Sequence, residues 1–344
     1  KILGSIKRLR IMEKIAVIGT TTWGTTLAIH IANKGIPVSL LTRTKKETSD
    51  LVQANENTRF LPGIPFPNSL EITDSQVQAL ENATILVIAV PSQSFRINLL
   101  QIKKHLNDSS IILSATKGLE KVSALRMSQI VKESLSPSIS KATCVLSGPN
   151  LAKEVLLGNP SLSVVASKSA KSAQRIQHIL TSNTFRIYTS SDLIGVEMGG
   201  ALKNIIALGS GICDGFDFGE NTKSAFITRG LAEITRLGVA TGANPRTFSG
   251  LAGLGDLIAT ATSKLSRNRY VGQQLARGIK LSDILTGMDN IAEGVHTTTA
   301  ALTLAKELKV DMPITAATAR ILFEDMSPRL AITELLQRPV TTEL

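Results

Sequence analysis

The sequence has few aromatic residues, few cysteines and no long apolar run. Aromatic residues make up 3% of its 344 residues, so a nucleic-acid surface of alternating basic and aromatic side chains is not expected. The two cysteines, Cys144 and Cys213, form no disulfide framework and favour a reducing, cytoplasmic location. The longest fully apolar run, Ile85–Val90, is far shorter than the ~20 residues of a membrane span, so no stable membrane insertion is expected.

Metal-ligand spacing is also missing from the sequence. The four histidines are scattered and neither cysteine belongs to a Cys-x-x-Cys motif, so no metal site is expected. The net charge of +11 favours anionic partners, although the charge is spread thinly along the chain. The local excess of basic residues lies at the start, and we expect residues 1–13 to be a disordered basic extension.

Strand and helix patterns alternate in residues 14–190. Lys14–Gly19 is an apolar run ending in glycine, Trp23–Lys34 has helical spacing, and Ile36–Thr42 is a second buried strand. This βαβ order predicts an α/β domain with a parallel-rich sheet, followed by a purely helical domain over residues 191–340. Between the strands, we expect a short polar helix at Ser49–Thr58 and a proline-rich loop at Phe60–Asn68.

The helical domain opens with Ser191–Gly215, a segment that is apolar on every side and is therefore expected to be buried. Lys203 and Asn204 lie in its middle. The Lys203 side chain leans over Gly199 and Gly200, so we expect a bare surface beside the ammonium that leaves room for a small molecule. The alternative is a core helix whose lysine reaches solvent.

The turn after the first strand partly matches the G-x-G-x-x-G dinucleotide fingerprint. Gly19 and Gly24 are present, but Thr21 stands at the middle glycine, where its β-carbon is expected to push phosphates out or shift the loop. An ordinary strand–helix turn explains the pattern nearly as well. The end of the second strand has Arg43 where an acid normally binds the ribose, so NADP is at least tolerated, or Arg43 is a solvated turn residue.

Further candidate site residues come at the ends of other strands and in later helical segments. Pro91, Lys117 and Asn150 come at strand ends, where ligands gather in such sheets. Asp256 lies in an apolar, glycine-rich segment and is either a partner of Lys203 or a helix cap. Ser266–Arg269 combines a hydroxyl, guanidinium groups and an amide at an expected helix N-terminus, which indicates a phosphate site or an exposed basic cap.

These blocks resemble the NAD(P)-dependent sn-glycerol-3-phosphate dehydrogenases of the bacterial type. The similarity extends from about Glu13 to about Gln337, and its most specific parts are Lys203-Asn204 and Arg267-Asn268. The remaining matching motifs are Gly19-x-x-x-Trp23-Gly24-Thr25, Ala115-Thr116-Lys117-Gly118, Ser147-Gly148-Pro149-Asn150 and Gly255-Asp256-Leu257.

The resemblance implies an α/β Rossmann-like N-terminal domain with a parallel-rich sheet, an all-α C-terminal domain, and reduction of dihydroxyacetone phosphate to sn-glycerol 3-phosphate for glycerophospholipid synthesis. It implies that Lys203 carries the catalytic proton, assisted by Lys117 and Asp256. The implied substrate-binding residues are Lys117, Asn150, Lys203, Asn204, Asp256, Ser266, Arg267 and Asn268. The implied residues for NAD or NADP are Gly19, Thr22, Trp23, Gly24, Arg43, Pro91, Lys117, Gly148, Ala152, Arg267, Ile291 and Glu293.

The sequence departs from the family pattern at two positions. Thr21 puts cofactor binding in question and motivates a non-catalytic NAD(P)-binding protein as an alternative. Asn150 stands where many bacterial members have Ser or Thr, although eukaryotic members carry Asn, so we expect the substrate contact to persist. A related hydroxyacid dehydrogenase of similar two-domain build is a second alternative. We also expect a homodimer and a small phosphorylated substrate. The sequence does not decide between NAD and NADP.

Overall fold

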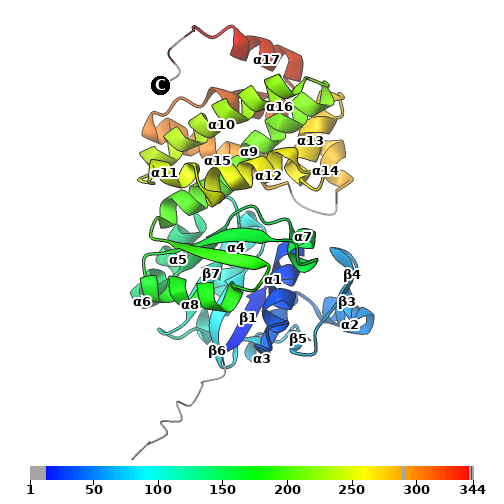
Figure 1. Cartoon of the computed structure of the whole chain (residues 1–344), viewed down its shortest axis with the longest axis vertical. Helices are drawn as coiled ribbons and strands as arrows, with labels where there is room; N and C mark the ends of the chain where they lie inside the picture. Colours follow the sequence, from blue (N-terminus) through cyan, green and yellow to red (C-terminus); the bar gives the residue numbers. More distant parts are fainter. Residues whose placement is uncertain (1–12, 289–291, 341, 343–344) are drawn as a thin grey trace, which may run out of the picture.

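The computed structural model describes residues 13–288, 292–340 and 342. Figure 1 shows two stacked parts, a sheet with its helices and, beyond it, a bundle of helices. The expectations for residues 1–12 and for Ile291 lie outside the described residues. Glu13, the last residue of the expected disordered extension, is instead tied to the fold, because Arg175 Nε contacts its carboxylate at 2.6 Å.

The first part contains an eight-stranded sheet in which β9 and β10 run antiparallel to the other six strands. The expected parallel-rich sheet is therefore confirmed. In spatial order the strands are β10 (Phe185–Ser190), β9 (Ser161–Ser167), β8 (Cys144–Ser147), β7 (Ile111–Ser114), β6 (Ala83–Ile88), β1 (Lys14–Ile18), β2 (Val38–Leu41) and β5 (Leu70–Thr73).

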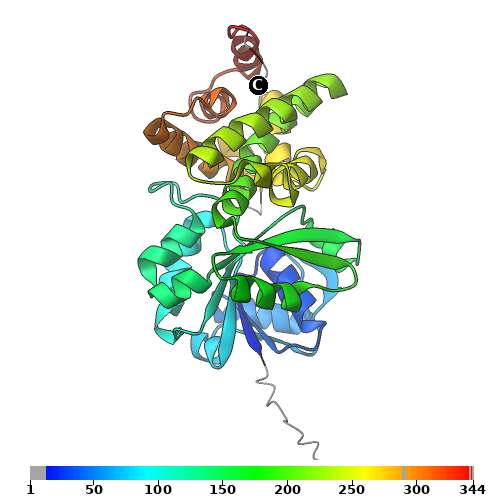
Figure 2. The same ribbon diagram turned by 60° about the vertical axis from the view of Figure 1, so that its left-hand side comes forward.

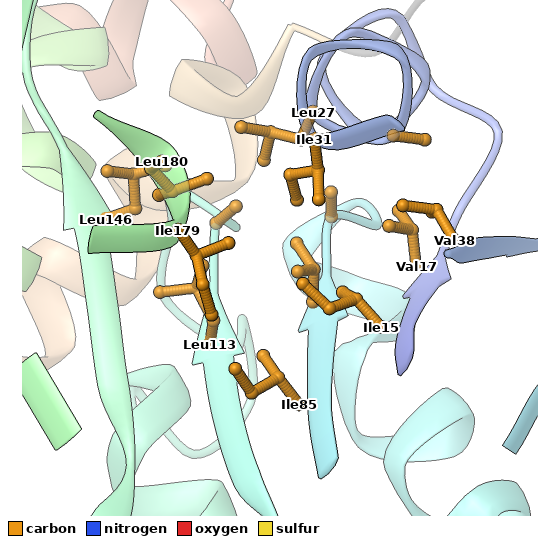
Figure 3. Close-up of a cluster of buried hydrophobic side chains, with 14 of the residues drawn as sticks. Ile15, Val17, Leu27, Ile31, Val38, Ile85, Leu113, Leu146, Ile179 and Leu180 are labelled. Carbon is orange, nitrogen blue, oxygen red and sulfur yellow. The ribbon is translucent and has the colours of Figure 1, made fainter. Parts of the chain in front are cut away.

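Helices cover both faces of this sheet, which explains why its central strands are apolar throughout. Alternate residues of β1 point to opposite faces: Ile15 and Val17 pack in one cluster and Ala16 and Ile18 in another. Figure 3 shows the first cluster, in which Leu27 of α1 lies over the strands. The helices are α1 (Thr22–Ala32), α2 (Lys45–Ala54), α3 (Gln76–Leu80), α4 (Phe95–Ile102), α5 (Met127–Ser134), α6 (Pro137–Ala142), α7 (Ala152–Leu156) and α8 (Ala170–Leu180).

The segment after β2 differs from the sequence expectation. Helix α2 begins at Lys45, because Thr44 caps it, and it ends before Asn55, which has a left-handed φ of 51°. The expected helix at Ser49–Thr58 was thus placed too far along the chain. The expected loop at Phe60–Asn68 contains a strand, β4 (Leu61–Pro65), which pairs with β3 (Glu56–Asn57).

The second part is helical, as expected, and is built around α9 (Leu193–Gly215), which is buried along almost its whole length. Asp192 caps α9 by accepting a hydrogen bond from the Gly195 amide. Figures 1 and 2 show the later helices gathered with α9 beyond the sheet. They are α10 (Glu220–Ala240), α11 (Pro245–Phe248), α12 (Asp256–Thr262), α13 (Arg267–Ala276), α14 (Leu281–Thr286), α15 (Glu293–Leu308), α16 (Pro313–Phe323) and α17 (Pro328–Leu336). Most of them pack against α9, whereas α14 packs against α13, and α17 packs against α13 and α16.

A membrane-crossing helix would need both length and apolar character. Within the described ranges, no helix combines the two to the degree that a bilayer requires.

Candidate active site

A cavity of about 940 Å³ lies where the carboxyl ends of the strands meet the helical part. Its walls come from the ends of β1, β2, β6 and β7 and from α9, α12, α13 and α15. The sequence-predicted site residues that line it are Gly19, Thr22, Trp23, Arg43, Pro91, Lys117, Asn150, Lys203, Asn204, Asp256, Ser266, Arg267, Asn268 and Glu293. Gly24, Gly148 and Ala152 are not part of this lining.

Two lysines from different parts of the fold share one carboxylate in this cavity. Lys203 Nζ donates to Asp256 Oδ1 at 2.5 Å, and Lys117 Nζ donates to Asp256 Oδ2 at 2.7 Å. The Asp256 side chain is 3% exposed and that of Lys203 is 7% exposed. Asp256 is the first residue of α12, but its carboxylate binds these side chains and does not cap the helix. The geometry therefore matches the expected partnership of Asp256 with Lys203.

The environment sets the protonation of both groups. Burial lowers the pKa of Lys203, Asp256 raises it, and the nearby charges of Lys117 and Arg267 lower it again, giving a pKa of about 8. Burial alone would raise the pKa of Asp256, but the two ammonium groups outweigh burial and hold it below its ordinary value. At neutral pH the carboxylate is ionised, and Lys203 is largely protonated, about one pH unit below its titration midpoint.

The sequence predicts open space beside Lys203 over Gly199 and Gly200, but in the structure that space is filled. A β-carbon on Gly199 would lie 2.6 Å from the Ala252 carbonyl oxygen, and one on Gly200 would lie 2.5 Å from Ser147 Oγ. The two glycines therefore allow close packing of other segments and do not leave a bare surface. The open space lies on the Asn204 side, toward the N-terminus of α13.

Sequence reasoning missed two hydroxyl groups of this cluster. Thr260 Oγ1 accepts a hydrogen bond from Lys203 Nζ, and Ser147 Oγ donates to Asp256 Oδ2 at 3.3 Å. Thr260 lies one helical turn after Asp256, so the helical spacing could have revealed it. Ser147 ends β8, where it falls beside the other strand-end residues.

The N-terminus of α13 faces the cavity. Ser266 caps this helix through its Oγ, which accepts from the Arg269 amide. Arg267 lines the cavity, and its guanidinium has no hydrogen bond or ion pair within the described part of the chain. Arg269, in contrast, points away and contacts Asp214 at 2.5 Å. A helix terminus with one available guanidinium is suited to a phosphate group.

Two asparagines fix this anion site against α9. Asn268 Nδ2 donates to Asn204 Oδ1 at 2.9 Å, while Asn268 Oδ1 accepts from the Gly294 amide at 2.9 Å. Asn204 Nδ2 retains only a long contact of 3.5 Å with the Gly200 carbonyl oxygen. That amide group is therefore available to donate into the cavity.

Lys117 and Asn150 line the cavity from the sheet-bearing part of the fold. Lys117 Nζ donates to the Gly148 carbonyl oxygen at 2.9 Å, which is how Gly148 takes part without lining the cavity. Asn150 Nδ2 donates to Ser163 Oγ at 3.0 Å. The Asn150 Oδ1 atom is buried without a hydrogen-bond partner among the described residues.

The glycine-rich turn after β1 is shaped for close backbone approach. Gly19 has a φ of +110°, and a β-carbon on Gly24 would lie 2.0 Å from the Gly19 carbonyl oxygen, so larger residues are disfavoured at both positions. Thr21 has an ordinary φ of −65° and caps α1. Its Oγ1 accepts from the Gly24 amide and donates to the Ala89 carbonyl oxygen at 2.7 Å. Thr21 therefore joins the turn to the end of β6.

This turn fits a dinucleotide. Thr22 and Trp23 open helix α1 and line the cavity, so the N-terminus of α1 faces it, as in pyrophosphate-binding turns. Trp23 Nε1 is buried and lacks a hydrogen-bond partner among the described residues. On the other side, Glu293 accepts from the Ser92 amide at 2.9 Å and thereby bridges the two parts of the fold. Ala152 begins α7 directly after Leu151, which lines the cavity, but it is not itself part of the lining.

Comparison with known proteins agrees with this architecture. The family model of the NAD-dependent glycerol-3-phosphate dehydrogenase N-terminus matches residues 14–173, and that of its C-terminus matches residues 192–333. A glycerol-3-phosphate dehydrogenase, NAD(P)+, of Dehalococcoides mccartyi is 48% identical over 97% of this chain and 93% of that protein. The enzyme of the same name from Koribacter versatilis is 45% identical over 97% of this chain and 99% of that protein.

A solved structure supports the same assignment. The crystal structure of glycerol-3-phosphate dehydrogenase from Coxiella burnetii has a TM-score of 0.91 and 35% sequence identity, covering 95% of this chain and 100% of that one. The family matches, the identities and the shared fold all point to one group of NAD(P)-dependent enzymes. The chain belongs to the NAD-dependent glycerol-3-phosphate dehydrogenase family.

Proposed function

We propose that this enzyme works mainly as a reductase, converting dihydroxyacetone phosphate to sn-glycerol 3-phosphate with NAD(P)H. The observation that carries the proposal is the Lys203–Asp256–Lys117 cluster, with a Lys203 pKa of about 8. A lysine with this pKa is largely protonated at neutral pH and can still release its proton. Such a group suits the reduction of a ketone, whose oxygen must gain a proton.

Each part of the fold has its own task in this proposal. Residues 14–190 would hold the dinucleotide, because the N-terminus of α1 suits a pyrophosphate and Arg43 lies at the strand end where such folds hold the adenosine ribose. Residues 191–340 would bind the substrate together with Lys117 and Asn150 and supply the catalytic lysine. When bound, NAD(P)H would supply the hydride for the carbonyl carbon. We propose the same roles for the site residues predicted from the sequence; Ile291 lies outside the described residues.

The phosphate of the substrate is held far from the reacting carbon. The Ser266 hydroxyl, the Arg267 guanidinium and the Asn204 amide all have hydrogen atoms to donate at the N-terminus of α13. Binding energy gained at this remote group orients the carbonyl against Lys203. Lys203 Nζ would give its proton to the carbonyl oxygen when the ketone is reduced. Asp256 keeps the lysine in place throughout.

A steady-state assay with a matched pair of variants tests this mechanism. Lys203→Met should lower kcat for dihydroxyacetone phosphate by about 10²–10⁴-fold and leave NAD(P)H binding nearly unchanged. Lys34→Met is the control, because Lys34 Nζ donates to three carbonyl oxygens near α8, outside the cavity. Normal turnover by Lys203→Met would overturn the mechanism. Equal kcat/KM values for dihydroxyacetone and its phosphate would overturn the anion site and favour a related hydroxyacid dehydrogenase.

The metabolic role, the cellular location and the oligomeric state of this enzyme are further proposals. We propose that the product supplies glycerophospholipid synthesis, which growth of a glycerol-3-phosphate auxotroph expressing this chain would check. Two buried free thiols, Cys144 and Cys213, support a reducing, cytoplasmic location. The expected homodimer stays a prediction, and light scattering on the purified protein measures its mass.

A further inference from the structure

An acidic side chain reaches the end of β2 from the first turn of α2. The Glu47 carboxylate accepts from the Arg43 amide at 2.9 Å and from Thr20 Oγ1 at 2.5 Å. The same carboxylate lies 3.5 Å from Arg43 Nε. Thr20 and Arg43 both line the cavity, so Glu47 contacts two residues of its wall.

Helix capping does not account for this arrangement. Thr44 caps α2, and its Oγ1 accepts from the Glu47 amide at 3.1 Å. In a reciprocal capping box, the acid at this position would accept from the amide of the capping residue itself. Glu47 instead reaches one residue further back, to Arg43, and crosses to Thr20 in the glycine-rich turn. The carboxylate is therefore fixed beside the mouth of the cavity.

The charge of Glu47 is maintained at neutral pH. Burial would raise the pKa of Glu47, but the hydrogen bonds from Thr20 and the Arg43 amide and the charge of Arg43 hold it below its ordinary value. The surroundings hold further charges: Asp74 lines the cavity just after β5, and the exposed Lys45 and Lys46 begin α2. Arg43 itself is 74% exposed and is the cation at the cavity wall that Glu47 contacts.

We propose that Glu47 is a specificity-determining residue that lowers the affinity of the enzyme for the 2′-phosphate of NADPH. The inference rests on the proposed placement of the adenosine ribose at the end of β2, where dinucleotide-binding folds hold it. Arg43 replaces the usual acid there and by itself would favour a 2′-phosphate. Glu47 supplies an acid from the next helix, partly neutralises Arg43 and repels a phosphate monoester. Glu47 acts on the cofactor indirectly, by reducing the effective charge of Arg43 and by electrostatic repulsion of the phosphate.

Equilibrium binding of the two reduced cofactors to the full-length enzyme tests the proposal. Glu47→Gln keeps the shape and an acceptor oxygen and removes the charge. A unit charge about 7 Å from a doubly charged phosphate at a water-exposed site changes affinity about 5- to 10-fold. We expect the Kd of NADPH to fall by about that factor and the Kd of NADH to change by less than about twofold. The matched control is Asp50→Asn, which removes an exposed carboxylate from the same helix.

Competition with fragments reads the same subsite without the nicotinamide. Displacement of bound NADH by 2′,5′-ADP should strengthen in Glu47→Gln, while displacement by 5′-AMP should not. An equal change in both Kd values, or the same change in Asp50→Asn, would show a merely structural or general electrostatic effect and would overturn the proposal. Weaker NADPH binding by Glu47→Gln would overturn it as well, because Glu47 would then orient Arg43 toward the phosphate. If the unaltered enzyme bound neither cofactor, the proposed cofactor placement itself would fail.

Discussion

Replacing Asp256 with asparagine tests the electrostatic cluster most directly. The change keeps the size of the side chain and removes the carboxylate that both Lys203 and Lys117 contact, at 2.5 and 2.7 Å. Asp256 raises the pKa of Lys203, whereas burial and the charges of Lys117 and Arg267 lower it. Without the carboxylate only the lowering influences remain, so the pKa of Lys203 must fall below about 8.

The size of the fall follows from the contact distance. An opposite charge within about 4–6 Å shifts a pKa by about 1–3 units, so a loss of about 1.5 units is a moderate expectation. At pH 7.5 the protonated fraction of Lys203 would then drop from about 75% to about 10%, roughly an eightfold loss for ketone reduction. Oxidation of glycerol 3-phosphate needs the neutral amine as proton acceptor and should lose less. The two directions therefore respond differently to one substitution.

The assay is the pH dependence of kcat in both directions, from about pH 6 to pH 9.5. For reduction, the unaltered enzyme should lose activity as the pH rises through about 8, and Asp256→Asn should lose it at lower pH. Asp214→Asn is the control, because Asp214 also contacts two cations, Lys223 at 2.7 Å and Arg269 at 2.5 Å, outside the cavity. It should lower thermal stability without moving the pH profile. An unchanged or raised midpoint in Asp256→Asn would refute the reasoning.

Three further substitutions probe the turn and the anion site. Gly24→Ala should cost more than about 3 kcal/mol, seen as a lower unfolding temperature, because its β-carbon would lie 2.0 Å from the Gly19 carbonyl oxygen. Thr21→Gly should destabilise by about 1 kcal/mol through loss of the bond to the Ala89 carbonyl oxygen, and titration should show no gain in NAD(P)H affinity. Arg267→Met should lower kcat/KM for dihydroxyacetone phosphate by about 100-fold, mainly through KM. Unchanged activity toward the phosphorylated substrate would remove Arg267 from the anion site.

The fold and the central cluster were predictable because strong local patterns encode them. The apolar run of α9 with a single lysine in its middle indicated either a functional lysine or one that reaches solvent, and Asp256, in a later apolar and glycine-rich segment, was its expected partner or a helix cap. The prediction of open space over Gly199 and Gly200 was wrong, since Ala252 and Ser147 fill it. A glycine in a sequence indicates only that another group approaches the backbone closely. Whether a ligand or another segment does so depends on packing between elements far apart in sequence.

The surroundings of Arg43, at the end of β2, were likewise not predictable from the sequence. From the sequence, Arg43 was either a cation suited to NADP or a solvated turn residue, but Thr44 starts a helix there and brings Glu47 back to Arg43. The basic segment after β2 therefore contains an acid, Glu47, whose carboxylate is held against Arg43. Charge composition cannot reveal this, because the result depends on which way one side chain points.

The tuning of Lys203 depends on both parts of the fold being together. Within the helical part, burial and the charge of Arg267 lower the pKa of Lys203, and Asp256 raises it. Lys117 comes from the end of β7 in the other part, contacts the same carboxylate and lowers the pKa of Lys203 further by its own positive charge. The sheet thus contributes more than a cofactor platform, because it supplies one of the two cations that, with burial, lower the pKa of Lys203. Separation of the two parts would break the contact between Lys117 and Asp256 and would remove the lowering effect of Lys117 on the pKa of Lys203.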